Sequence, residues 1–263
     1  MQKPNVLRVN GKEIMLTHAS ALLHDNAEGL LDLPTELRIL LSDCEAPAGA
    51  LAGIAFDLPV ERMAKEGKLR GLLLKLDPND AGELRIVLLD APEDPHGMLL
   101  THTLTSTNKD TIKGFKFAGG MASGTIEQSG DAESAFEDMP DVSYSASFQA
   151  ALIKEAAITS DLKGKDAQNS AQAKIIMKKG EALENKDFNA LSLLSTAGAN
   201  QRHEVFLSNP AFLKAAPQAG AEMKKSVQKI TRVVERGARA IVIFDGTSWA
   251  NFVKEGQEWK SDD

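Results

Sequence analysis

Arg202, His203 and Glu204 are three consecutive residues whose side chains are typical of a catalytic or binding site. They lie in the stretch 200–207, whose composition predicts a helix. Histidine is the side chain best suited to take up a proton near neutral pH, so His203 is the candidate general base. Neighbouring positions on a helix point in different directions, so the three side chains cannot all face one pocket. The alternative is an ordinary solvated helix face.

A second group of candidate residues is aromatic. Trp249 and Phe252 fall on one predicted strand, and Trp259 falls on the next. Aromatic walls bind apolar ligands, but aromatic residues also fill the cores of sheets. We therefore take Arg202, His203, Trp249 and Phe252 as candidate ligand-binding residues. For the two aromatics, a place in the core of the sheet is the alternative.

The histidines and the single cysteine do not show the spacing of a metal site. No two of the histidines lie at i and i+4, or at i and i+2, where two imidazoles can share one ion. His18 and His102 could meet only if their strands are neighbours. Cys44 has no second cysteine, which excludes an internal disulfide, and a small buried side chain is the alternative to a catalytic thiolate. We predict no metal and no cofactor.

Three further motifs have structural explanations. The glycine-rich segment 119–124 lacks the strand-then-helix setting of a phosphate-binding loop and predicts a turn or bulge between strands. Asp187 stands directly before an apolar helical stripe, so it is predicted to be an N-cap rather than a catalytic carboxylate. The acidic stretch 131–141 lacks the spacing of a calcium-binding loop and predicts a solvated loop.

Charge is distributed unevenly along the chain. Residues 1–157 hold 14 Lys and Arg against 24 Asp and Glu, a net charge of −10, whereas residues 158–263 hold 16 against 13, a net charge of +3. Binding to nucleic acid depends on neutralising phosphates, so the acidic first part predicts no nucleic-acid partner. No apolar run approaches the roughly 18–20 residues that a membrane helix needs. The sequence therefore predicts no transmembrane segment.

Residues 1–157 show the strand and turn patterns of a mostly antiparallel β sandwich or barrel. Asn10-Gly11, between 6–9 and 12–17, predicts a type I′ hairpin in which Arg8 faces Glu13. A helix is predicted at 58–66. In 142–150, alternate residues are apolar, which predicts a strand with one buried face. Further strands are predicted at 36–42, 68–76, 83–89, 98–105, 111–117 and 125–128.

Residues 158–263 predict helices packed on a four-stranded antiparallel meander, so the expected fold class is α+β with two domains, 1–157 and 158–263. The polar stretch 161–170 is predicted to be a linker. Helices are expected after caps at Ser170, Asp187 and Asn209, with Pro210 opening a short last helix. The strands of the meander are predicted at 227–235, 238–244, 247–253 and 257–260.

The order of elements and two local phrases carry a resemblance. The phrases are ENKDFNAL at 184–191 and EGQEWK at 255–260. With helices followed by a meander, residues 167–263 resemble the nuclear transport factor 2-like cone superfamily in its small exported bacterial form. This resemblance implies a curved sheet that can hold a pocket, and a periplasmic or secreted location. The beginning of the chain has no apolar targeting segment, which fits a mature exported protein or, alternatively, a cytoplasmic one. Residues 1–157 resemble a β-domain of bacterial proteins, with no activity implied.

These observations predict a binding or interaction module of the bacterial envelope that is not an enzyme. Its partner would be a small apolar ligand in the second domain or another protein. The alternative is a small-molecule enzyme of hydrolase or isomerase type, which would use a pocket in the second domain with His203 as the base. A structural subunit that forms a homodimer through the outer face of the meander is a third interpretation.

Overall fold

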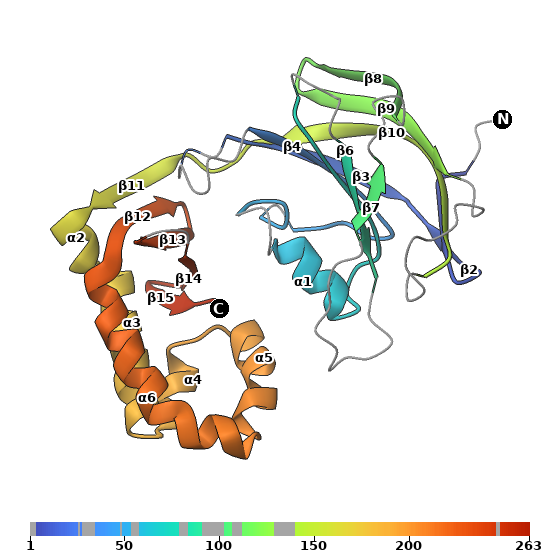
Figure 1. Ribbon diagram of the computed structural model, residues 1–263. Coiled ribbons are helices and arrows are strands. Elements are labelled where there is room, and N and C mark those ends of the chain that lie inside the picture. The colour runs from blue at the N-terminus through green and yellow to red at the C-terminus, as the bar shows by residue number, and fades with distance from the viewer. Residues whose placement is uncertain are drawn as a thin grey trace. The chain divides into compact units, whose positions relative to one another are not determined.

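The chain divides into two compact units, Met1–Glu155 and Ala156–Asp263 (Figure 1). The predicted boundary, between 157 and 158, lies two residues beyond this division. No helix in the described part of the chain is long and apolar enough to cross a membrane. The computed structural model describes residues 4–25, 27, 35–47, 49–53, 58–78, 84–90, 103–106, 112–128, 140–245 and 248–263.

The N-terminal unit is one ten-stranded sheet that curls, with the short helix α1 (Pro59–Lys65) packed on it. Its strands run in the order β2-β1-β10-β3-β4-β5-β6-β7, and β9 and β8 continue from the other edge of β10. Among the described strands only β10 and β3 pair in parallel. The strands are β1 (Val6–Val9), β2 (Lys12–Met15), β3 (His18–His24), β4 (Glu36–Ser42), β5 (Gly71–Leu76), β6 (Leu84–Leu89), β7 (Thr103–Ser106), β8 (Ile112–Ala118), β9 (Met121–Gln128) and β10 (Val142–Ile153).

The long strand β10 organises this sheet. Its first residues pair with β1 and its last residues pair with β3, while β9 pairs along most of its length. Side chains alternate between the two faces of a strand, so the apolar residues of β10 that the sequence pattern indicated all point to one side. These residues, Val142, Tyr144, Ala146, Phe148 and Ala150, are buried as predicted.

The two faces of the curled sheet have separate apolar cores. The larger core is enclosed by the curl and takes residues from strands along the whole sheet, such as Leu7, Ile39 and Ile126. The smaller one lies on the opposite face of β3–β6, where Leu40 and Leu73 pack against residues of α1 and of the segment before it. Strands β4 and β5 are thus buried on both sides. As a result, polar side chains on these strands are held away from water.

Several local predictions for this unit are confirmed. The hairpin turn at Asn10 and Gly11 has positive φ angles of 49° and 75°, and Arg8 and Glu13 form an ion pair at 2.9 Å. Strand β3 was not predicted. Ala21, Leu22 and His24 are all buried, so β3 lacks the alternation of a half-exposed strand. The predicted residues 98–102 and the acidic stretch 131–139 lie outside the described residues.

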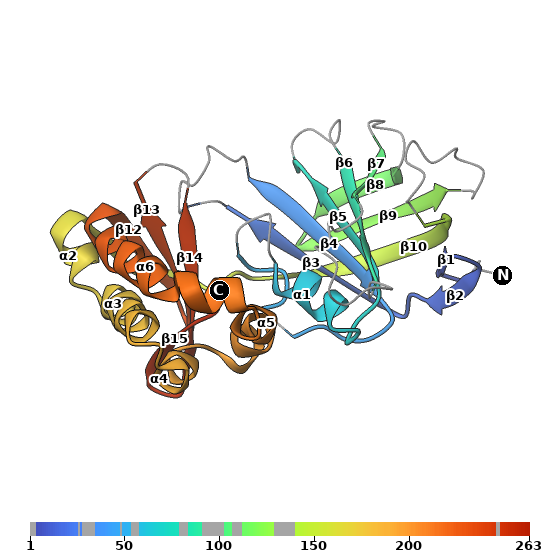
Figure 2. The same ribbon diagram turned by 60° about the horizontal axis from the view of Figure 1, so that its bottom comes forward.

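The C-terminal unit places helices on one face of a five-stranded antiparallel sheet. Figures 1 and 2 show α3 and α6 side by side along this face. The strands, in the order β11-β12-β13-β14-β15, are β11 (Ile158–Lys163), β12 (Ile230–Arg236), β13 (Arg239–Phe244), β14 (Trp249–Glu255) and β15 (Glu258–Ser261). The helices are α2 (Gly164–Gln168), α3 (Ala171–Glu184), α4 (Phe188–Leu193), α5 (Ala197–Leu207) and α6 (Pro210–Ser226), followed by the 3₁₀ turn η2 (Val227–Lys229).

Three predictions for this unit are wrong in detail. The predicted linker at 161–170 is the end of β11 followed by α2, so the sheet has five strands instead of four. Strand β11 lies at the edge and is largely exposed, so its sequence carries almost no apolar signal. Helix α6 has 17 residues and continues past Pro217, whereas a short helix was expected. The caps at Ser170, Asp187 and Asn209 are confirmed by their side-chain hydrogen bonds to Ala173, Ala190 and Ala211.

Two glycines let α3 and α6 cross closely. A Cβ atom on Gly180 would lie 2.8 Å from the carbonyl oxygen of Gly220, and a Cβ on Gly220 would lie 2.4 Å from that of Gly180. Such distances leave no room for a side chain at either position. The crossing fixes the position of α3 along α6, and with it the position of Lys179, the residue before Gly180.

Candidate functional site

Lys179 is a lysine on the buried face of α3. The buried positions of this helix include Ala173, Ile176, Gly180 and Leu183, and Lys179 lies among them with only 6% of its surface exposed. Its Nζ donates a hydrogen bond to Ser261 Oγ at 2.7 Å. Within the described part of the chain this is the only hydrogen bond of the ammonium. Lysines are almost never buried to this degree unless they are paired, so the residue needs an explanation.

The end of β15 and the beginning of α5 are joined beside Lys179. Thr196 donates its backbone N–H to the Ser261 carbonyl at 2.8 Å, and its hydroxyl donates to Asp262 Oδ1 at 2.8 Å. The same hydroxyl caps α5 by accepting from the Ala199 N–H. Arg202, one turn further along α5, donates to the Asp262 carbonyl through Nη2. These bonds hold the exposed end of the sheet against the helix that carries Arg202 and His203.

His203 and Lys179 have altered proton affinities because each loses hydration near other positive charge. Loss of hydration lowers the pKa of Lys179 to about 8, with the charge of Arg202 acting in the same direction and that of Asp263 against it. Loss of hydration also lowers the pKa of His203, and the charges of Lys179 and Arg202 lower it further. His203 is therefore neutral at pH 7, while most Lys179 side chains still carry a proton.

Asp263 supplies a carboxylate whose charge acts on Lys179. Asn251 on β14 binds it twice, from the backbone N–H at 2.7 Å and from the side-chain amide at 3.1 Å. Although the residue as a whole is exposed, partial loss of hydration around its carboxylate raises the pKa of Asp263. Lys179, Arg202, His203 and Asp263 thus act on one another electrostatically, and we call this set the Lys179 cluster.

The four residues proposed from the sequence do not form one site. Arg202 and His203 belong to the Lys179 cluster, while Glu204 is exposed, in keeping with helix geometry. Phe252 is 1% exposed and belongs to the core between sheet and helices. Trp249 is three residues away on the same strand, so its side chain points to the opposite face of the sheet.

Sequence reasoning missed Lys179, although a signal was present. The apolar stripe of α3 follows Ala173, Ile176, Gly180 and Leu183, and Lys179 falls inside that stripe at three residues after Ile176. A charged residue at a core position of a helix indicates either a buried partner or a function. Ser261 and Asp263 are more than eighty residues away along the chain, so the sequence did not indicate the partner.

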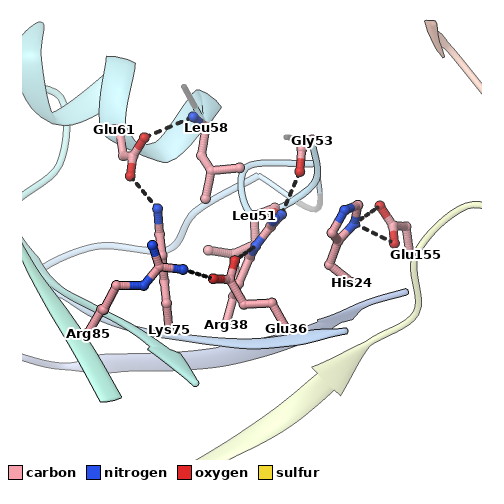
Figure 3. A network of polar contacts seen from close by, with 10 residues as sticks. All are labelled: His24, Glu36, Arg38, Leu51, Gly53, Leu58, Glu61, Lys75, Arg85 and Glu155. Atoms are coloured by element: carbon pink, nitrogen blue, oxygen red, sulfur yellow. Dashed lines mark hydrogen bonds and ion pairs between the residues drawn. The ribbon is translucent and has the colours of Figure 1, made fainter. Parts of the chain in front are cut away.

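A second polar network lies in the N-terminal unit, on the face of the sheet that carries α1 (Figure 3). Arg38 donates from Nε to Glu36 at 2.8 Å, and Arg85 donates to the other oxygen of Glu36 at 2.6 Å. Lys75 donates to Glu61 at 2.7 Å, and both of these side chains are 4% exposed. Strands β4, β5 and β6 contribute Arg38, Lys75 and Arg85, which lie opposite one another in the strand register. The otherwise apolar sequences of these strands did not indicate this connection.

His24 and Glu155 form a separate contact at the edge of the same view. His24 Nδ1 lies 3.2 Å from both carboxylate oxygens of Glu155, and both side chains are largely buried. His18 instead contacts the hydroxyl of Thr17, and His96 and His102 lie outside the described residues. In the part of the chain that the structure describes, no three His, Cys, Asp or Glu side chains form a group that could hold a metal ion.

Of the remaining sequence motifs, the glycine-rich turn is confirmed, whereas Cys44 is not the buried side chain that was expected. Gly119 and Gly120 have positive φ angles and form the tight turn between β8 and β9, as predicted. Cys44 is partly exposed and its Sγ contacts the Lys68 carbonyl at 3.5 Å. Loss of hydration and the nearby charge of Asp43 raise the pKa of the Cys44 thiol. A raised pKa disfavours the reactive thiolate.

Comparisons of the chain with protein-family models, with curated proteins and with solved structures find no match. The resemblance of residues 167–263 to the cone superfamily therefore stays a prediction. The Lys179 cluster and the network in Figure 3 each hold charged side chains that are withdrawn from water in the described structure.

Proposed function

We propose that this protein is a binding module and that its C-terminal unit holds a small ligand bearing a carboxylate at the Lys179 cluster. The observation that supports this proposal is the ammonium of Lys179, held in a buried side chain with one hydrogen bond to Ser261 in the described structure. An ammonium has three N–H donors, so two remain for a ligand. Arg202 adds a second positive charge, and the neutral imidazole of His203 can donate one further hydrogen bond.

A carboxylate is favoured over the apolar ligand that the sequence predicted. Phe252 belongs to the core, and Trp249 lies on the other face of the sheet, so the two aromatics do not form a common wall. Asp263, by contrast, already brings one carboxylate close to Lys179, where Asn251 binds it. An external carboxylate would take the same type of contact, and the Asp263 side chain would compete with it.

The proposal can be tested by thermal stability and titration calorimetry with the full chain at pH 7. We expect members of a panel of acetate, succinate, citrate and benzoate to stabilise the C-terminal unit, with about 2.7 kcal/mol gained at a concentration near 100 times Kd. The Lys179→Met variant should lose this response. Lys178→Met should keep it, because Lys178 is the adjacent but exposed lysine of the same helix.

The Asp263→Asn variant should change carboxylate affinity in the opposite direction to Lys179→Met. Removing the competing carboxylate should tighten binding of the external carboxylate by about fivefold, the effect of one unit charge near a partly exposed site. If no carboxylate in the panel binds, or if Lys178→Met weakens binding as much as Lys179→Met, the proposal is wrong.

Catalysis at the same cluster is the second candidate function. It is favoured by His203, whose lowered pKa leaves a neutral imidazole able to accept a proton at pH 7. If a substrate of hydrolase or isomerase type is turned over, His203→Ala should abolish turnover while thermal stability changes by less than about 1 kcal/mol, because the imidazole makes no hydrogen bond in the described structure. Turnover that persists in this variant would exclude His203 as the base.

The proposed location is the bacterial envelope, periplasmic or secreted, with the cytoplasm as the alternative. This proposal is supported by the family resemblance of the C-terminal unit alone. Binding through the Lys179 cluster would be possible in either compartment, since it needs neither a cofactor nor an oxidised cysteine.

A further inference from the structure

Three basic side chains lie in a row across the face of the N-terminal sheet that carries α1. Arg38 on β4 is directly opposite Lys75 on β5, and Lys75 is directly opposite Arg85 on β6. Neighbouring strands are about 4.8 Å apart, so the three positive charges are close together. Figure 3 shows these side chains extending from the sheet toward α1 and the segment before it. We call Arg38, Lys75 and Arg85, with Glu36 and Glu61, the Arg38 network.

The guanidinium of Arg38 is fixed on two of its three nitrogens. Nε donates to Glu36, and Nη1 donates to the carbonyl oxygens of Leu51 at 2.8 Å and Gly53 at 2.7 Å. The residue is fully buried, and among the residues that the structure describes Nη2 has no hydrogen-bond partner. Buried polar atoms in proteins almost always have a partner, which is a protein atom, a water molecule or a bound ion. The two N–H groups on Nη2 therefore indicate a missing acceptor.

The charges of the Arg38 network indicate whether the missing acceptor is neutral or charged. Glu36 is shared between Arg38 and Arg85, and Glu61 is bound by Lys75 and by the Leu58 N–H. Both carboxylates are thus already in use. The five side chains named in the Arg38 network carry three positive and two negative charges, so this set has a net charge of +1. A monovalent anion would both accept from Nη2 and neutralise that charge.

We propose that Nη2 of Arg38 binds a halide ion, chloride under ordinary conditions. Complete burial of Arg38 and a single donor nitrogen favour a small spherical anion that needs few directed hydrogen bonds. Chloride also loses hydration more readily than a carboxylate does. The site is independent of the Lys179 cluster, since it lies in the N-terminal unit and requires a different anion. Arg85 is 46% exposed and marks the side of the network that faces solvent.

Bromide replaces chloride at such sites and can be located by anomalous X-ray scattering. Crystals of the full chain grown in sodium bromide should show an anomalous peak within about 3.5 Å of Arg38 Nη2. A feature at that position without anomalous signal would be a water molecule, and the proposal would then be wrong.

The role of charge can be tested by measuring stability in solution for Arg85→Gln. All proteins in this experiment also carry Lys179→Met, so that binding at the Lys179 cluster does not contribute. Stability should rise with sodium chloride relative to sodium gluconate at equal ionic strength. Removing the exposed charge of Arg85 should weaken chloride binding by about tenfold. The matched control is Arg8→Gln, an equally charged change at an exposed ion pair of the same unit. Equal chloride dependence of both variants would contradict the proposal.

Discussion

Lys179→Met is expected to make the C-terminal unit more stable near pH 7 while removing its affinity for carboxylates. A pKa lowered from 10.5 to about 8 means that the fold disfavours the charged lysine by about 3 kcal/mol. Methionine fills a similar volume without charge. The variant loses the hydrogen bond to Ser261, which contributes about 1 kcal/mol. The expected net gain is therefore about 2 kcal/mol.

The stability that Lys179→Met gains over the wild type should fall as pH rises above 8. Between pH 8 and 10.5 the unfolded chain keeps its proton on Lys179 while the folded protein releases it, so the stability of the wild type rises with pH in this window. The advantage of Lys179→Met is thus fully present below pH 8 and disappears as pH approaches 10.5. Urea unfolding followed by tryptophan fluorescence measures it, since Trp249 and Trp259 both lie in the C-terminal unit.

This experiment separates a functional lysine from a structural one. If Lys179 mainly fastens the end of β15 to α3, its replacement should destabilise the unit at every pH. If the lysine is kept for a ligand, the protein carries a destabilising buried charge that binding offsets, as is common in functional sites. A loss of stability in Lys179→Met at pH 7 would favour the structural role and weaken the proposal of a carboxylate site.

The parts of the fold that follow from neighbouring residues could be predicted from the sequence. The turn at Asn10-Gly11 depends on the φ angles of two residues, and the caps at Ser170 and Asp187 depend on hydrogen bonds over three residues. Strand β11 could not be predicted, because its partner β12 lies far along the chain and its own exposed residues carry no apolar pattern. Local rules describe an element well only when its own sequence carries the signal.

The candidate sites required contacts that no local pattern contains. Arg202 and His203 were predicted from their chemistry, but the cluster centres on Lys179, whose bond to Ser261 spans 82 positions. In the N-terminal unit, Arg38, Lys75 and Arg85 meet only through the register of three strands. The signal by which such a row could be sought is a series of otherwise apolar antiparallel strands whose basic residues fall alternately near the beginning and near the end of each strand.

Glu61→Gln is expected to produce the largest loss of stability in the N-terminal unit. Glu61 accepts from Lys75 at 2.7 Å and from the Leu58 N–H at 3.0 Å, and the Glu61 and Lys75 side chains are each 4% exposed. Glutamine keeps the shape but removes the negative charge that Glu61 places against the Lys75 ammonium. Breaking a buried ion pair in this way costs about 3–5 kcal/mol. Urea unfolding followed by far-UV circular dichroism, with the tryptophan signal as an internal reference for the other unit, measures the loss.

The double variant Glu61→Leu with Lys75→Met determines what the pair contributes. Because a buried ion pair gives little net stability over apolar residues of similar size, the double variant should recover most of the loss. The control Glu13→Gln breaks the exposed pair with Arg8 and should cost less than about 1 kcal/mol. A double variant as unstable as Glu61→Gln would show that α1 depends on the charges themselves. Recovery would mean instead that the apolar core beneath α1 supplies the stability of this region and that the charges themselves add little to it.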